Sequence, residues 1–275
     1  MEIDERDIDE CNAVGWGGDR TWQLDRRLRP TDYLLRLRME ATIDMISEPI
    51  DSPVSILDLG CGIGIFPLNI AKKYGNASVI GIDISKRSIE IANELARKAK
   101  LSDRVKFMVG DVRAALPRES FDYVICTEVL EHLLDPGTAL DNICQICGPA
   151  TWLIVSVPHL YKSRKGQEGI FYRQMSDVDF SIIVDTQDRQ LLDPNRKTYK
   201  YYHKQYSFEE ISKLLNDHGF SVISYQGIKV QMRYVKTAMG ILGISKPVRK
   251  LDGLLNKYTR NRYAGNFILK CKKAE

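Results

Sequence analysis

The stretch Ile56-Leu-Asp-Leu-Gly-Cys-Gly-Ile-Gly64 decides the fold, because a short apolar run gives way to closely spaced glycines and then to a helical pattern. A dense apolar run over 54–59 predicts a buried strand. Glycines at 60, 62 and 64 allow a tight turn from strand to helix, whose backbone can approach a ligand closely. The stretch therefore predicts the first strand and helix of a parallel sheet, with a ligand site between them.

The same alternation of apolar runs and helical stretches continues along the chain and predicts an α/β fold with a doubly wound, mostly parallel sheet. The first five strands are expected at Val54–Leu59, Ser78–Asp83, Val105–Val109, Tyr123–Thr127 and Thr151–Val157. The helices between them are expected at Ile65–Tyr74, Lys86–Ala99 and Pro136–Ile146. Further elements are a capped helix from Ser207 to about Asn216, a strand near Phe220–Tyr225 and a last strand within Gly265–Lys272.

At 275 residues the chain is long enough to bury one large core, so we expect a single domain rather than two. Apolar spacing predicts N-terminal helices between Trp22 and Ile46. The stretch after His159 has no clear period and is too long for an ordinary loop, which favours an active-site lid. The expected parts are a mobile leader over 1–20 and a domain over 21–275, with a core over 50–158, a lid insertion over 159–205 and a C-terminal helix–strand part over 206–275, which includes a basic helical insertion over 229–263.

Composition argues against membrane-spanning and secreted proteins. No apolar run approaches the roughly 18 residues that a membrane helix needs. The start, Met1–Glu10, holds six acids and one arginine, which is unlike a signal peptide. Six scattered cysteines fit a reducing compartment. We therefore expect a cytoplasmic protein without a transmembrane segment.

Cys144 and Cys147 have the spacing of metal ligands, but no second pair accompanies them. They stand at the end of a predicted helix, where residues three apart share one face. We interpret them as packing residues.

Charge is unevenly distributed. The net charge is +4, yet the tail from Lys229 to Glu275 holds 12 Lys and Arg against two acids, so 12 − 2 = +10. A solvated basic surface explains this simply, whereas contact with RNA, a phosphorylated substrate or a lipid surface is the more specific alternative.

Three acids follow three successive predicted strands and should meet at one edge of the sheet. Asp58 lies beside the glycine turn, where a carboxylate would repel a pyrophosphate but accept hydrogen bonds from an amino-acid ammonium. Asp83 can accept both ribose hydroxyls. Asp111 suits the exocyclic amine of adenine, with the Val112 backbone on the ring edge. Each acid alone could be a cap or turn residue; together, and with Ile65 replacing the third glycine of the dinucleotide pattern, they favour S-adenosylmethionine over NAD.

At these residues the chain resembles class I S-adenosylmethionine-dependent methyltransferases, in particular the ubiquinone-pathway O-methyltransferase type. The resemblance spans roughly Pro53–Pro158 and includes Gly110-Asp111 and Phe121-Asp-Tyr-Val-Ile-Cys-Thr-Glu-Val-Leu-Glu-His132. It implies a seven-stranded sheet with an antiparallel last strand. We expect methyl transfer from S-adenosylmethionine to a small or medium-sized acceptor, with oxygen as the acceptor atom. The methyl-donor site that the resemblance implies comprises Asp58, Gly60, Cys61, Gly62, Gly64, Asp83, Ile84, Asp111, Val112 and Thr127.

The stretch Glu128-Val-Leu-Glu-His132 is the most informative beyond the methyl-donor site. If a helical turn follows the fourth strand, Glu128, Glu131 and His132 can converge on one point. The resemblance extends to small-RNA 3′-end 2′-O-methyltransferases, where two acids and a histidine help hold a divalent cation. Mg²⁺ or Mn²⁺ would suit these ligands, with His203 as a fourth. Without a metal, His132 or His203 could act as the general base, with Glu131 beside them in the catalytic set.

Several alternatives remain open at this level. The chain could be an RNA 2′-O-methyltransferase with a divalent metal, or a non-catalytic S-adenosylmethionine-binding regulatory protein. Peripheral membrane contact through Val230–Arg262 is a third possibility. His159 and the aromatic residues of the lid could contact the acceptor, or only pack the insertion onto the domain.

Overall fold

The computed structural model describes residues 38–46, 52–133, 135–159, 168–174, 192–193, 198–228 and 265–274, and between 160 and 203 it describes the backbone of strands only. Seven strands form one sheet in the order β3-β2-β1-β4-β5-β10-β9. Their bounds are β1 (Val54–Leu59), β2 (Ala77–Asp83), β3 (Val105–Val109), β4 (Tyr123–Thr127), β5 (Trp152–Pro158), β9 (Phe220–Ile228) and β10 (Asn266–Lys273).

The pairs among β1 to β5 are parallel, and β10 runs antiparallel to both β5 and β9. The seven-stranded sheet with an antiparallel last strand is thereby confirmed. Strands predicted from short apolar runs differ from the observed ones by a few residues at most, because runs of buried residues leave little freedom in where a strand lies.

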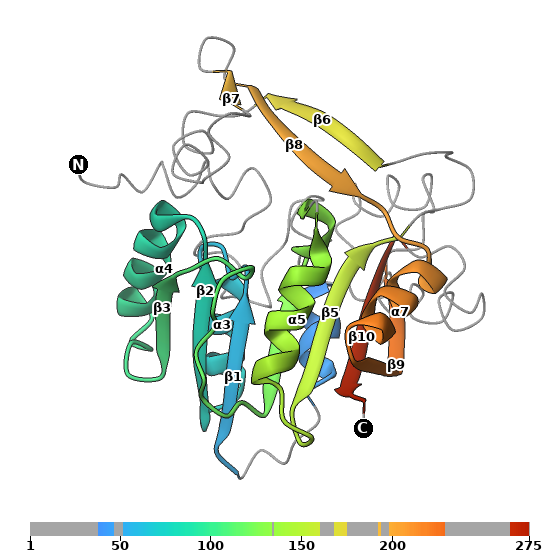
Figure 1. Cartoon of the computed structure of the whole chain (residues 1–275). Helices are drawn as coiled ribbons and strands as arrows, with labels where there is room; N and C mark the ends of the chain where they lie inside the picture. The colour runs from blue at the N-terminus through green and yellow to red at the C-terminus, as the bar shows by residue number, and fades with distance from the viewer. Residues whose placement is uncertain are drawn as a thin grey trace, which may run out of the picture.

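Helices cover both faces of this sheet (Figure 1). One buried cluster joins the strands to α3, α4 and the helix over 38–44, and a second cluster on the opposite face joins them to α5 and α7. The bounds are α3 (Ile65–Lys73), α4 (Lys86–Lys98), α5 (Pro136–Ile146) and α7 (Phe208–Asp217), and a short 3₁₀ turn, η3 (Leu130–His132), follows β4. The doubly wound architecture predicted from the alternation is confirmed.

Side-chain caps explain where three of these helices begin. Ser85 accepts from the Ser88 N–H at the start of α4, and Asp135 accepts from two N–H groups at the start of α5. Ser207 and Glu210 form the predicted capping box of α7. These caps satisfy N–H groups that have no partner inside the helix, so they place each helix start.

The described part of the stretch over 159–205, which we predicted to be a lid, contains a small antiparallel sheet that the sequence pattern did not predict. Its strands are β6 (Glu168–Gln174), β7 (Leu192–Asp193) and β8 (Thr198–Lys204), in the order β6-β8-β7. In Figure 1 this sheet lies beyond the carboxyl edge of the main sheet, and β8 contacts η3. These strands therefore lie over the edge where the candidate site lies.

Cys144 and Cys147 lie at the end of α5. Lys273 Nζ donates to both of their carbonyls, at 2.9 and 3.2 Å, and burial raises the pKa of Cys147 to about 12. A thiol with such a raised pKa is rarely ionised, and the ionised form is the one that binds metals and takes part in redox reactions. This favours the packing interpretation.

Some predictions lie outside the described residues. These are the leader over 1–20, the N-terminal helix before residue 38, the basic insertion over 229–263 and the side chains of the lid aromatics and His203. Among the helices that are described, none combines the length and apolar character needed to cross a membrane.

Candidate active site

The topology brings the three predicted acids to one edge of the sheet. β3, β2 and β1 are neighbours, so Asp58 near the end of β1, Asp83 at the end of β2 and Asp111 two residues after β3 share the carboxyl edge. Asp83 lies close enough to Asp58 for its charge to raise the pKa of Asp58. Ligands of open α/β sheets bind at this edge.

The glycine turn between β1 and α3 is left-handed at all three glycines, with φ of 73° at Gly60, 53° at Gly62 and 85° at Gly64. Gly60 N–H donates to the Ile82 carbonyl at 2.8 Å, so the turn is tied to β2. A Cβ at Gly60 would lie 2.3 Å from Val129 Cγ2. The turn therefore needs glycine for both its dihedral angles and its close contacts.

Asp83 ties the same turn to the end of β2. Its Oδ2 accepts from the Gly62 N–H at 2.8 Å, and its Oδ1 accepts from the Ser85 N–H at 2.9 Å. Burial raises the pKa of Asp83, while these two N–H groups lower it, and the net shift is upward. Each carboxylate oxygen has two acceptor positions, so both oxygens keep one that a hydroxyl could use.

Asp58 is almost fully buried, with 2% of its surface exposed. Burial raises the pKa of Asp58 well above its ordinary value, and the neighbouring Asp83 raises it further. An added cation would reverse this shift, because it favours the charged carboxylate.

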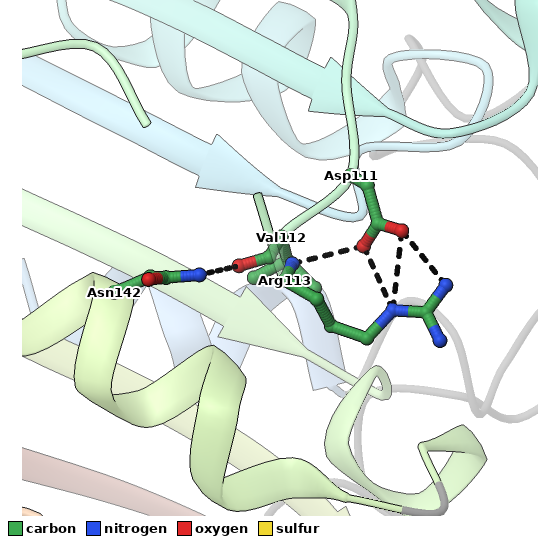
Figure 2. Close-up of polar contacts among 4 residues, drawn as sticks. All are labelled: Asp111, Val112, Arg113 and Asn142. Atoms are coloured by element: carbon green, nitrogen blue, oxygen red, sulfur yellow. Dashed lines mark hydrogen bonds and ion pairs between the residues drawn. The ribbon is translucent and has the colours of Figure 1, made fainter. Parts of the chain in front are cut away.

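The remaining methyl-donor residues of the prediction lie around the same edge. Cys61 is buried in the glycine turn, Thr127 is buried at the end of β4, and Ile84 follows Asp83. Asp111 is clamped by Arg113, two residues further along, and the Val112 side chain is buried (Figure 2).

The predicted convergence of Glu128, Glu131 and His132 on a metal is not supported. Glu128 does not belong to a helical turn: its φ is 56°, and only Leu130–His132 are helical. Its carboxylate accepts hydrogen bonds from Arg38, Ser156 Oγ (3.0 Å) and Asn266 Nδ2 (3.0 and 3.1 Å). A carboxylate that already holds a cation and two neutral donors has little left to offer a metal.

Glu131 and His132 also point to different surroundings. Glu131 is 1% exposed, and its Oε2 is buried without a hydrogen-bond partner, whereas His132 is exposed. Burial raises the pKa of Glu131 well above its ordinary value, and Glu128 raises it further. Within the part of the chain that the structure describes, no three His, Cys, Asp or Glu residues form a group that could hold a metal.

Sequence reasoning missed the partners of Glu128. Arg38 is 90 positions away in the chain and Asn266 is 138 away, so no local pattern relates them to Glu128. Together with Ser156 they connect the helix over 38–44, β5 and β10 at the end of β4.

We expect Glu128→Gln to destabilise the fold by about 1–3 kcal/mol, because it leaves the half-buried Arg38 without its counter-charge. Urea denaturation measures this, with Glu119→Gln as a control, since Glu119 is exposed. Equal stability of the two variants would contradict the importance of the Arg38–Glu128 pair.

Comparison with known proteins agrees with this geometry. A family model described as a methyltransferase domain matches residues 50–242. The chain belongs to this methyltransferase domain family. Among curated proteins, this chain is similar to a ubiquinone biosynthesis O-methyltransferase of Paracidovorax citrulli, with 32% identity over 139 residues. The aligned residues are 50% of this chain and 56% of that protein.

A probable chloroplastic tocopherol O-methyltransferase of Oryza sativa is 34% identical over 125 residues, 44% of this chain and 34% of the relative. The chain thus spans about half the length, or less, of these curated relatives. Among solved structures, the magnesium protoporphyrin IX methyltransferase of Synechocystis, determined with SAH bound, has a TM-score of 0.54 and 18% identity and covers 97% of this chain and 98% of its own. At that identity the likeness concerns the fold of the methyltransferase domain.

Proposed function

We propose that this protein binds S-adenosylmethionine and transfers its methyl group to an oxygen of a small or medium-sized acceptor. The observation that carries the proposal is the arrangement at the carboxyl edge, where three aspartates at or near the ends of neighbouring strands share this edge with a turn that has glycine at three positions. Membership of the methyltransferase domain family supports the reaction type. The named O-methyltransferase relatives support oxygen as the acceptor atom.

The chemistry of this edge fits an adenosyl amino acid. The charged form of the buried Asp58 is disfavoured by burial and by the half-buried Asp83, and a ligand ammonium beside Asp58 would favour that charged form. The free acceptor positions of Asp83 suit the ribose hydroxyls. Asp111 suits the exocyclic amine of adenine, and three carboxylates at one edge would repel a dinucleotide pyrophosphate.

The methyl donor supplies an already activated methyl group, so the protein chiefly has to align the acceptor and exclude water. The lid sheet over the carboxyl edge suits the second task (Figure 1). His132, exposed on η3 beneath β8, is our candidate to accept the proton of the acceptor hydroxyl, and His203 on β8 is the second. Burial and the neighbouring Glu128 raise the pKa of Glu131, which favours its neutral form.

The proposal is tested by calorimetry with S-adenosylmethionine and NAD, followed by a methyl-transfer screen. The acceptors are catechols, quinol precursors, sugars, amines and small RNAs, each with and without chelator. Binding of the methyl donor and chelator-insensitive turnover of a hydroxylated small molecule is the expected result. Binding without turnover would favour a regulatory protein, turnover of RNA an RNA-modifying enzyme, and binding of NAD alone would overturn the proposal.

We expect the affinity for the methyl donor to fall as the solution becomes more acidic. The pKa of Asp58 is raised in the free protein, and a bound ammonium lowers it, so binding releases protons. Affinity should therefore rise with pH between the lower, ligand-bound value and the raised, free value. Calorimetry in buffers of different ionisation enthalpy measures the released protons, and Asp58→Asn should abolish the release. A pH-independent affinity in the wild type would contradict the assignment of Asp58.

A further inference from the structure

In the loop after β3, Arg113 donates hydrogen bonds to both oxygens of the Asp111 carboxylate. Arg113 Nη2 donates to Oδ2 at 2.7 Å, and Nε lies 3.0 Å from Oδ1 and 3.1 Å from Oδ2. The backbone N–H of Arg113 also donates to Oδ1, at 2.9 Å. Figure 2 shows the guanidinium facing the carboxylate edge to edge.

This arrangement restricts what Asp111 can still accept. A carboxylate has about four acceptor positions, and three N–H groups of Arg113 engage it, so about one position remains. The side-on contact through Nε and Nη2 also fixes the plane of the carboxylate. The side chains of Asp111 and Arg113 are 17% and 40% exposed, so the pair itself should add little to the stability of the fold.

The backbone of the loop is held from the other side. Asn142 Nδ2 of α5 donates to the Val112 carbonyl at 3.2 Å. The peptide between Val112 and Arg113 is thus engaged at both ends, since its N–H contacts Asp111 and its carbonyl contacts Asn142 (Figure 2). Burial alone would raise the pKa of Asp111, but the hydrogen bonds and charge of Arg113 outweigh it and the pKa is lowered. Asp111 is therefore an ionised, oriented acceptor.

On the basis of the proposed function, we propose that Arg113 is a positioning residue for the base of the methyl donor. By leaving Asp111 one oriented acceptor position, it selects a base that points a single N–H toward the carboxylate, as the exocyclic amine of adenine does. A base with a carbonyl oxygen in that place would meet the carboxylate with two acceptors facing each other. Without Arg113 the carboxylate can turn away, so the two bases are distinguished less well.

Calorimetry on the full chain tests this with S-adenosylhomocysteine and S-inosylhomocysteine, which carries a carbonyl oxygen in place of the amine. Arg113→Ala should bind the adenosyl ligand about fivefold more weakly and the inosyl ligand nearly unchanged, as expected for one hydrogen bond that loses its orientation. Arg113→Lys should not restore the discrimination, because an ammonium cannot clamp both oxygens. Arg97→Ala is the matched control, since Arg97 is an exposed arginine in the last turn of α4.

Asp111→Ala completes the test as a double-mutant cycle. In that background Arg113→Ala should change neither affinity, because Arg113 acts through Asp111. Tighter binding of the adenosyl ligand by Arg113→Ala would mean that the arginine competes with the base. An unchanged ratio of the affinities for the adenosyl and inosyl ligands would mean that Arg113 does not position Asp111. Either result overturns the inference. Thermal unfolding verifies that the variants are folded, and Arg113→Lys carries the test if Arg113→Ala is not. A wild-type protein that binds neither ligand would instead refute the proposed function, and the inference with it.

Discussion

Gly64→Ala should abolish measurable binding of the methyl donor and lower the free energy of unfolding by about 3 kcal/mol. Gly64 has φ of 85°, and a Cβ there would lie 2.5 Å from Phe107 Cζ and 3.1 Å from Ala92 Cβ. The buried Phe107 ring has little room to move, so the start of α3 must shift instead. Urea denaturation and calorimetry with S-adenosylmethionine measure the two effects.

Gly75→Ala is the matched control for this variant. Gly75 lies in the exposed turn between α3 and β2, and a Cβ there would have nothing within 4 Å. We expect wild-type stability and affinity from it. A Gly64→Ala protein that binds the methyl donor as tightly as Gly75→Ala would show that the glycine turn does not form the ligand site.

Asp83→Ala should lower the affinity for the methyl donor about 100-fold, because two hydrogen bonds from the ribose hydroxyls to a charged group are lost. The same change leaves the N–H groups of Gly62 and Ser85 without their acceptor, so the glycine turn loses its tie to β2. Calorimetry with S-adenosylhomocysteine measures the total effect. Asp103→Ala, at an exposed acid in the turn before β3, serves as the control.

The two contributions of Asp83 can be separated with the 2′-deoxy analogue of S-adenosylhomocysteine. The wild type should bind this analogue more weakly than the parent ligand, whereas Asp83→Ala should bind both alike. If the variant still prefers the parent ligand to the same degree, Asp83 acts only by holding the glycine turn and does not contact the ribose.

The architecture and the meeting of the three aspartates at one edge could be predicted because their signals are local. A buried strand and an amphipathic helix each bury their apolar residues with their own period, so β1 and α5 lie where the pattern predicted. The glycine turn requires glycine at three alternate positions, 60, 62 and 64. Once the strands are known to be parallel, residues that follow them must meet at one edge, and this placed Asp58, Asp83 and Asp111 together.

The surroundings of Glu128 and the lid were decided only by the tertiary structure. Spacing predicted that Glu128 would join Glu131 and His132, yet its backbone is left-handed and its carboxylate pairs with Arg38 and Asn266 from distant elements. Likewise, β6 pairs with β8 from Glu168↔Lys204 to Gln174↔Thr198, between segments far apart in the chain, and the sequence of these strands has no clear alternation. The physical reason is the same in both cases: periodicity and turn chemistry act between neighbours in the chain, whereas the partner of a charge or of a strand edge depends on which distant segments the completed fold brings beside it.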